Sequence, residues 1–224
     1  MTNCRPNQIA QRRNCLLSAV VIVTTCGDSL AQEADGVGEF GELLAENISI
    51  PELSVMVAEC TRTLLVATAH TVVGKSLAES VVPPLVSLAT ECGEYSDDGD
   101  QEKNAEVSIV PKLVNDVLVG FALSMKGEQA SAGLSLVLPT LIRFLVDERN
   151  GVPEPQRRAY VNQKLVELAS RHGESFRTVV QSGLSAYQRE VLEKTLTGNQ
   201  ATPSEVGLPA ENAPKTHIEL KSFH

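Results

Sequence analysis

Apolar residues recur at steps of three and four along most of the chain, and this spacing predicts helices rather than strands. After Pro51 the pattern runs through Leu53, Val57, Cys60, Leu64, Leu65 and Ala67 and is interrupted at Gly74. Further helices are predicted over about residues 76–92, 107–125, 128–148, 156–171, 174–182 and 185–197. Gly127 and the segment RNGVPEP separate successive helices, because glycine and proline interrupt helical patterns.

The segment LSLVLPTLIRFLV, residues 134–146, is an apolar run with Pro139 at its centre. A central strand is excluded because proline donates no hydrogen bond to a sheet. A membrane span is disfavoured by the short run and by Arg143. We therefore predict a helix in which Pro139 costs about one hydrogen bond and introduces a kink.

This proline pattern occurs twice. LAESVVPPLVSLAT (77–90) and GLSLVLPTLIRFLV (133–146) both read as apolar run, proline and leucine-rich turn, and Pro84 and Pro139 are 55 residues apart. A third proline, Pro111, lies near the start of an earlier helix. Helix pairs that recur in this way are typical of HEAT and armadillo arrays, in which each pair covers the apolar face of its neighbour. Residues 51–197 are therefore predicted to form an all-α, HEAT/armadillo-like α-solenoid of about three helix pairs, with the kinked second helices along its inside.

Residues 1–50 allow two interpretations. Arg12 and Arg13 precede an apolar stretch, and Ser29-Leu30-Ala31 offers small residues, as in a cleaved secretory signal. Asn47-Ile48-Ser49 would then be a glycosylation acceptor. The alternative is a buried N-terminal helix. In both cases residues 27–41, with four glycines and several acids, are predicted to be a loop.

Two other segments are predicted to be non-helical. Residues 93–104 form a charged loop, and residues 198–224 form a disordered tail rich in Pro, Asn, Ala, Thr and Glu. Within the tail, THIELKSF (216–223) alternates apolar and polar residues and is a candidate for docking as an added strand or in a groove. If the chain is part of a longer array, we also expect an exposed apolar face at the N-terminal end of the stack.

The two proline segments resemble the second helices of HEAT repeats. The segment QRRAYVNQKLVELASRHGESFRTVVQSGLSAYQREVLEKTL (156–196) resembles the C-terminal end of a family of giant HEAT-repeat scaffolds associated with the clathrin adaptor complex through aftiphilin-type partners. The resemblance covers about residues 52–197, so this chain would be a C-terminal piece or a short form of such a scaffold.

This resemblance implies a non-enzymatic scaffold that acts in vesicle-mediated transport. The transport steps implied are endocytosis and endosome-to-Golgi transport, and the result is the correct localization of other proteins. It implies a cytoplasmic location at the Golgi and endosomes, adaptor or accessory proteins as partners, and only an indirect association with membranes. The alternatives are a secreted helical protein and a P-loop nucleotide-binding protein.

Composition narrows the partners further. The net charge of -9 disfavours nucleic acid and provides no attraction to anionic lipid. The five cysteines contain no C-x-x-C pair, which argues against structural zinc. Cys4, Cys15 and Cys26 are spaced by 11 residues, which places them on one helix face, and we expect them to be small buried hydrophobes.

The strongest signal for chemistry is AHTVVGKS (69–76), because Gly74-Lys75-Ser76 ends like a phosphate-binding loop and Asp147 would be the magnesium-side acid. Ala69 replaces the first glycine, however, and Val72 and Val73 stiffen the loop. Other candidate groups lack ligand spacing: His70, His172, His217, His224, Asp97, Asp98 and Asp100. We therefore predict no catalytic, cofactor-binding or metal-binding residue and no small-molecule substrate; His70 is expected at a helix end and His172 beside a helix C-terminus.

Overall fold

The computed structural model describes residues 6–26, 29–30, 34–91, 109–148 and 152–197. These residues form helices and no strand, which confirms the all-α prediction. The helices are α1 Pro6–Cys26, α2 Ala34–Asn47, α3 Pro51–Thr68, α4 Val72–Glu91, α6 Ile109–Ser124, α7 Glu128–Val146, α8 Glu154–Arg171, α9 Gly173–Ser182 and α10 Ala186–Thr197. The predicted loop at 93–104 and the predicted tail lie outside the described residues.

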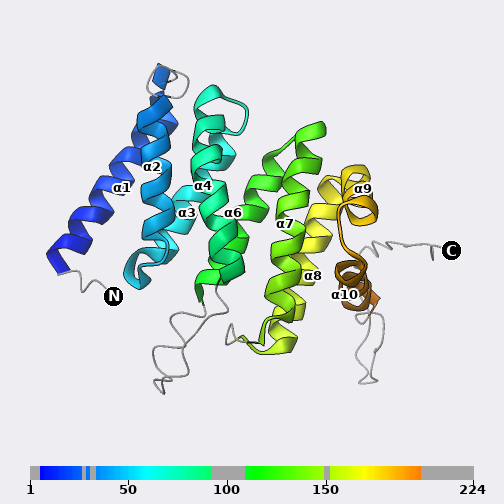
Figure 1. Ribbon diagram of the computed structural model, residues 1–224. Helices are drawn as coiled ribbons and strands as arrows, with labels where there is room; N and C mark the ends of the chain where they lie inside the picture. Colours follow the sequence, from blue (N-terminus) through cyan, green and yellow to red (C-terminus); the bar gives the residue numbers. More distant parts are fainter. Residues whose placement is uncertain (1–5, 27–28, 31–33, 92–108, 149–151, 198–224) are drawn as a thin grey trace, which may run out of the picture.

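The helices stack in two layers (Figure 1). One layer consists of α1, α3, α6 and α8, each packed against the next, and the other contains α2, α4 and α7 in the same relation. Helices α9 and α10 pack against α7 and α8. Successive helix pairs thus stack on one another as in a solenoid, in the order α3–α4, α6–α7 and α8–α9. Helices α1 and α2 precede these pairs.

The apolar run at 134–146 lies in α7, the second helix of a pair, as predicted. Its side chains at steps of three and four are fully buried: Leu134, Val137, Leu138 and Leu141 are all 0% exposed. Pro139 lies inside α7, and Pro83 and Pro84 lie inside α4, which is the second helix of the preceding pair. The kink expected at each proline stays a prediction.

The loop predicted at 27–41 is wrong from residue 34 onward, because α2 begins at Ala34. Val37 and Leu44 form a buried face on this helix, and they outweigh the low helix propensity of its glycines. Gly41 has a packing role, since a Cβ atom there would lie 2.1 Å from the Ser80 hydroxyl oxygen of α4. A glycine that permits close helix contact was thus mistaken for a helix breaker.

The predicted break at Gly74 is also misplaced. Helix α3 ends at Thr68 and α4 begins at Val72, so Gly74 lies in the first turn of α4. A Cβ atom at this position would lie 1.8 Å from the backbone oxygen of Thr68. Gly74 therefore allows the two helices to cross closely rather than separating them. The break predicted at Gly127 is correct: this residue has φ 56°, a conformation that favours glycine, immediately before α7.

The prediction of buried N-terminal cysteines is wrong for Cys15 and Cys26, which are exposed, while Cys60 is buried. The face of α1 that packs inward carries Leu16 and Val23 instead. Cys4 and Cys92 lie outside the described side chains.

The C-terminal half of α1 exposes large apolar side chains: Leu17, Val21 and Ile22 are 38%, 61% and 52% exposed. Its N-terminal half exposes polar residues, among them Arg12 and Arg13. The apolar face expected at this end of the stack is therefore present over only part of the helix.

Among the described residues, two helices are long and apolar enough to cross a membrane by length and composition alone: α4 over Val72–Thr90 and α7 over Glu128–Val146. Length is thus a weaker argument against a membrane span than the sequence suggested. Burial is more informative: 39% and 50% of the two windows are buried within the protein, as expected for core helices of a solenoid.

Candidate functional site

An apolar groove of about 760 Å³ opens between α4, α6 and α7. Its apolar lining consists of Ala69, Val72, Ala78, Val82 and Pro83 beside and on α4, Phe121 and Met125 at the end of α6, and Leu136 on α7. The rim is polar, with His70, Thr71, Lys75, Glu79 and Gln129. Val72 is 60% exposed and Leu136 is 42% exposed, so large apolar side chains border the groove in contact with water.

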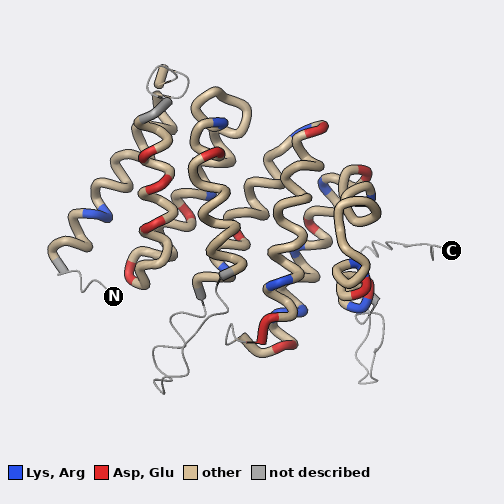
Figure 2. The backbone as a smooth tube through the Cα atoms, in the orientation of Figure 1, with Lys and Arg blue, Asp and Glu red and all other residues tan. Residues whose placement is uncertain are grey.

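The groove exists because short side chains meet at this junction. Ala69 and Ala78 do not fill the space, and the side chains of Lys75 and Glu79 are 79% and 68% exposed. Figure 2 shows that α7 is almost free of charge along its length, whereas α8 and α10 carry many charged residues. An apolar concavity with a few polar groups at its rim is typical of a binding site.

The phosphate-loop candidate lies at this groove, but its geometry does not form a phosphate cradle. The Gly74 N–H donates to the Thr71 hydroxyl at 3.0 Å, and the Lys75 N–H donates to the Thr71 carbonyl oxygen at 3.2 Å. These amides therefore do not point at a ligand. The preceding element is helix α3 instead of a strand.

The remaining phosphate-loop residue, Asp147, is not brought near the Gly74-Lys75 segment. It is the C-cap residue of α7, whereas the groove is lined by the N-terminal half of that helix. The Asp147 carbonyl oxygen accepts a hydrogen bond from the Arg157 guanidinium.

The two histidines within the described residues, His70 and His172, lie at helix ends, as expected. His70 follows α3, is exposed and borders the groove. His172 is the C-cap residue of α8, and its Nε2 lies 3.0 Å from the Ala122 carbonyl oxygen. His217, His224 and the three aspartates at 97–100 lie outside the described residues, within which no cluster of three potential metal ligands is found.

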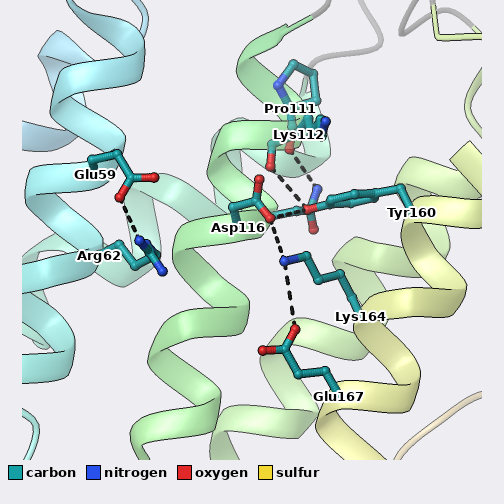
Figure 3. Close-up of polar contacts among 9 residues, drawn as sticks. Glu59, Arg62, Pro111, Lys112, Asp116, Tyr160, Lys164 and Glu167 are labelled. Atoms are coloured by element: carbon teal, nitrogen blue, oxygen red, sulfur yellow. Dashed lines mark hydrogen bonds and ion pairs between the residues drawn. The ribbon is translucent and has the colours of Figure 1, made fainter. Parts of the chain in front are cut away.

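A second polar feature, here called the polar seam, joins α6 to α8 and consists of Lys112, Asp116, Tyr160 and Lys164 (Figure 3). The Tyr160 hydroxyl donates to Asp116 Oδ1 at 3.0 Å, and Lys164 Nζ lies 2.9 Å from the same oxygen. The Lys112 and Lys164 ammonium groups lie 5.5 and 5.6 Å from the centre of the Tyr160 ring. The seam therefore ties two successive helix pairs together through one phenol.

Burial, and then the charge of Asp116, raise the pKa of Tyr160 well above its ordinary value. The phenol stays neutral and acts as a hydrogen-bond donor. Its ring also packs edge-on against Phe144, with ring centroids 5.4 Å apart. On α3, beside the seam, Arg62 pairs with Glu59 at 2.7 Å in an exposed position, where an ion pair contributes little to stability.

We expect Tyr160→Phe to lower the free energy of unfolding by about 1–2 kcal/mol at neutral pH, because the hydrogen bond to Asp116 is lost. The raised folded-state pKa means that Tyr160 stabilises the fold fully below the pKa of an unfolded tyrosine, about 10, and less as the pH rises above it. Denaturant unfolding at several pH values should therefore show that the variant loses less stability above about pH 10 than the original chain.

The matched control for this substitution is Tyr187→Phe, because Tyr187 is 63% exposed. It should leave stability unchanged at every pH. An identical alkaline decline in the chain with and without the Tyr160 hydroxyl would contradict the role given to that group.

Neither the groove nor the seam was found from the sequence. Tyr160 falls within the helix predicted over 156–171, but its partner Asp116 is 44 residues away and no local pattern connects them. The groove is formed by residues of three helices, and only its Ala69–Lys75 portion had been singled out, for a different chemistry.

Comparison with known proteins adds one relationship. Residues 33–207 match a protein-family model described as LAA1-like, C-terminal TPR repeats. No curated protein and no solved structure compared with the chain matches it. The family description names TPR repeats where the sequence suggested the HEAT or armadillo type; both are helix pairs that stack on their neighbours. Because the match covers more than half of the 224 residues, the chain belongs to the LAA1-like family, in its C-terminal repeat region, and is a helical repeat scaffold.

Proposed function

We propose that the chain is a non-enzymatic scaffold in clathrin-adaptor-linked vesicle traffic between the trans-Golgi and endosomes. In this proposal the groove between α4 and α7 holds an apolar segment of the adaptor complex or of an accessory protein. Membership of the LAA1-like family supports a scaffold, and the resemblance of residues 156–196 supports the adaptor connection. The single observation that carries the proposal is the apolar lining of the groove, which the residues described by the structure leave uncovered.

The groove offers enough apolar surface for a moderate affinity. Full burial of a side chain such as Leu or Val contributes about 1.5–3 kcal/mol, and Val72 and Leu136 are both available for burial by a partner. A few such contacts, less the cost of ordering the partner, correspond to dissociation constants on the order of micromolar. This is the range suited to reversible assembly on a vesicle coat.

The proposed location is the cytoplasmic surface of Golgi and endosomal membranes. The net charge of -9 gives the chain no electrostatic attraction to anionic lipid, so association with the membrane would depend on the bound partner.

Two exposed positions at the groove allow a direct test. We expect Val72→Asp and Leu136→Asp each to weaken binding to purified adaptor complex, or to its accessory protein, by about tenfold or more, because a charge is then placed in the apolar contact. Calorimetry or surface plasmon resonance would measure the change.

The control for both substitutions is Val166→Asp on α8, since Val166 is 40% exposed and does not line the groove. It should bind like the original chain. If neither the adaptor complex nor its accessory proteins bind the original chain, the trafficking proposal is wrong. Equal binding by all variants would place the contact elsewhere on the scaffold.

A further inference from the structure

Residues 198–224 of this chain follow α10 directly, and α10 packs against α7, one of the three helices that line the groove. Helix α7 has 19 residues, so its length is about 28 Å, and neighbouring helices lie about 10 Å apart. The path from the end of α10 to the groove is therefore at most about 40 Å. The twenty residues 198–217 can span about 65 Å when fully extended, so the following segment reaches the groove without strain.

The segment THIELKSF, residues 216–223, has a pattern that fits the groove. In an extended backbone, alternate side chains point to the same side, so Ile218 and Leu220 would enter the groove together. A volume of about 760 Å³ accommodates both side chains between Val72 on α4 and Leu136 on α7.

The charges of the segment complement those at the rim. Lys75 and Glu79 stand one helical turn apart on α4, and their mutual ion pair is long, at 3.9 Å, and exposed. Glu219 and Lys221 are also two charges of opposite sign, and an extended backbone separates them by about 6.5 Å on the side opposite Ile218 and Leu220. With Ile218 and Leu220 in the groove, Glu219 and Lys221 would lie at its open side, where the exposed Lys75 and Glu79 side chains of the rim could reach them, Lys75 toward Glu219 and Glu79 toward Lys221.

The tail is long enough to reach the groove, its alternating apolar residues fit the lining, and its charges complement the rim. We therefore propose that residues 216–223 bind in the groove of their own chain as an extended segment. The inference rests on the proposed function only in using the same groove. Because the segment is tethered, its effective concentration is in the millimolar range, and even weak contacts keep the groove occupied. A partner would have to displace it, and partner segments of the same class would carry two apolar residues two positions apart with an acid between them.

Cross-linking within the full chain tests this directly. Phe223→p-benzoylphenylalanine places a photoreactive group at the end of the segment. Illumination of the dilute chain, followed by mass spectrometry, should give links within one molecule to residues 69–83 or 129–136. We expect Leu136→Asp, or Ile218→Asp in the segment itself, to lower the yield of these links by about fivefold or more.

Three comparisons make the result decisive. Val166→Asp should leave the links unchanged. Glu219→Lys should lower their yield, and adding Lys75→Glu should restore part of it, since the charges are then exchanged. Links scattered over the surface and insensitive to Leu136→Asp would overturn the proposal, and so would links formed between two molecules. No partner protein is present in this experiment, so its failure leaves the adaptor-binding proposal to be judged by its own assay.

Discussion

Replacing Gly74 with alanine should lower the free energy of unfolding by about 3 kcal/mol. The added Cβ atom would lie 1.8 Å from the backbone oxygen of Thr68 and 2.8 Å from its side-chain oxygen. A backbone carbonyl at a helix end is not able to rotate away as a flexible side chain does. Helices α3 and α4 would therefore have to separate, and the cost would extend to the buried residues between them, such as Leu64 and Leu77. Urea unfolding followed by circular dichroism measures the loss.

The control for Gly74→Ala is the same substitution at Gly38 in α2, where no atom lies within 4 Å of the added Cβ. Alanine is the better helix former, so Gly38→Ala should raise the free energy of unfolding by about 0.5–1 kcal/mol. The two substitutions are chemically identical and should have opposite signs. If both stabilised the chain, the close crossing of α3 and α4 would not exist in solution.

Leu138→Ala is expected to lower the free energy of unfolding by about 2–5 kcal/mol, because the side chain is 0% exposed and its removal leaves a cavity in the core. Leu136→Ala, two residues away in the same apolar run, should change it by less than about 1 kcal/mol, since Leu136 is 42% exposed at the groove. Thermal or urea unfolding of the two variants would compare them. Equal losses would mean that α7 presents a different face to the core.

The helices with strong periodicity were predictable within a few residues. In α7 the buried residues stand at helical spacing on a long element, so Pro139 was recognised as lying inside a helix. The second helix of the preceding pair, α4, followed from the same comparison of proline segments. The positions of these helices could be predicted because the apolar pattern is local and many residues contribute to it.

Glycine was the main source of error. Gly41 and Gly74 are needed because they have no side chain, since each lies where two helices approach closely. From the sequence alone, a glycine needed for a contact resembles a glycine needed for a turn, since the partner atom belongs to a distant or separately placed element. Gly127, with φ 56°, shows the turn-forming case that the prediction assumed for all three.

The candidate site was less predictable than the fold. A groove depends on where three helices leave space unfilled, and no single helix contains that information. In the sequence, Leu136 belongs to an apolar run and Val72 to the phosphate-loop candidate, and only the packing shows that both border water at one groove. The polar seam was equally difficult to predict, because the Tyr160 hydroxyl contacts Asp116 only when α6 and α8 are packed together.

The unfilled junction between α4 and α7 also has a mechanical consequence. In a stack of helix pairs, each pair contacts only its neighbours, so the stability of the array depends on the interface at each junction. The polar seam adds a hydrogen bond and an ion pair between α6 and α8, whereas the groove leaves space unfilled between α4 and α7 in the opposite layer. A segment wedged into the groove would resist closure of that space. A groove occupant would therefore limit how closely α4 and α7 can approach each other.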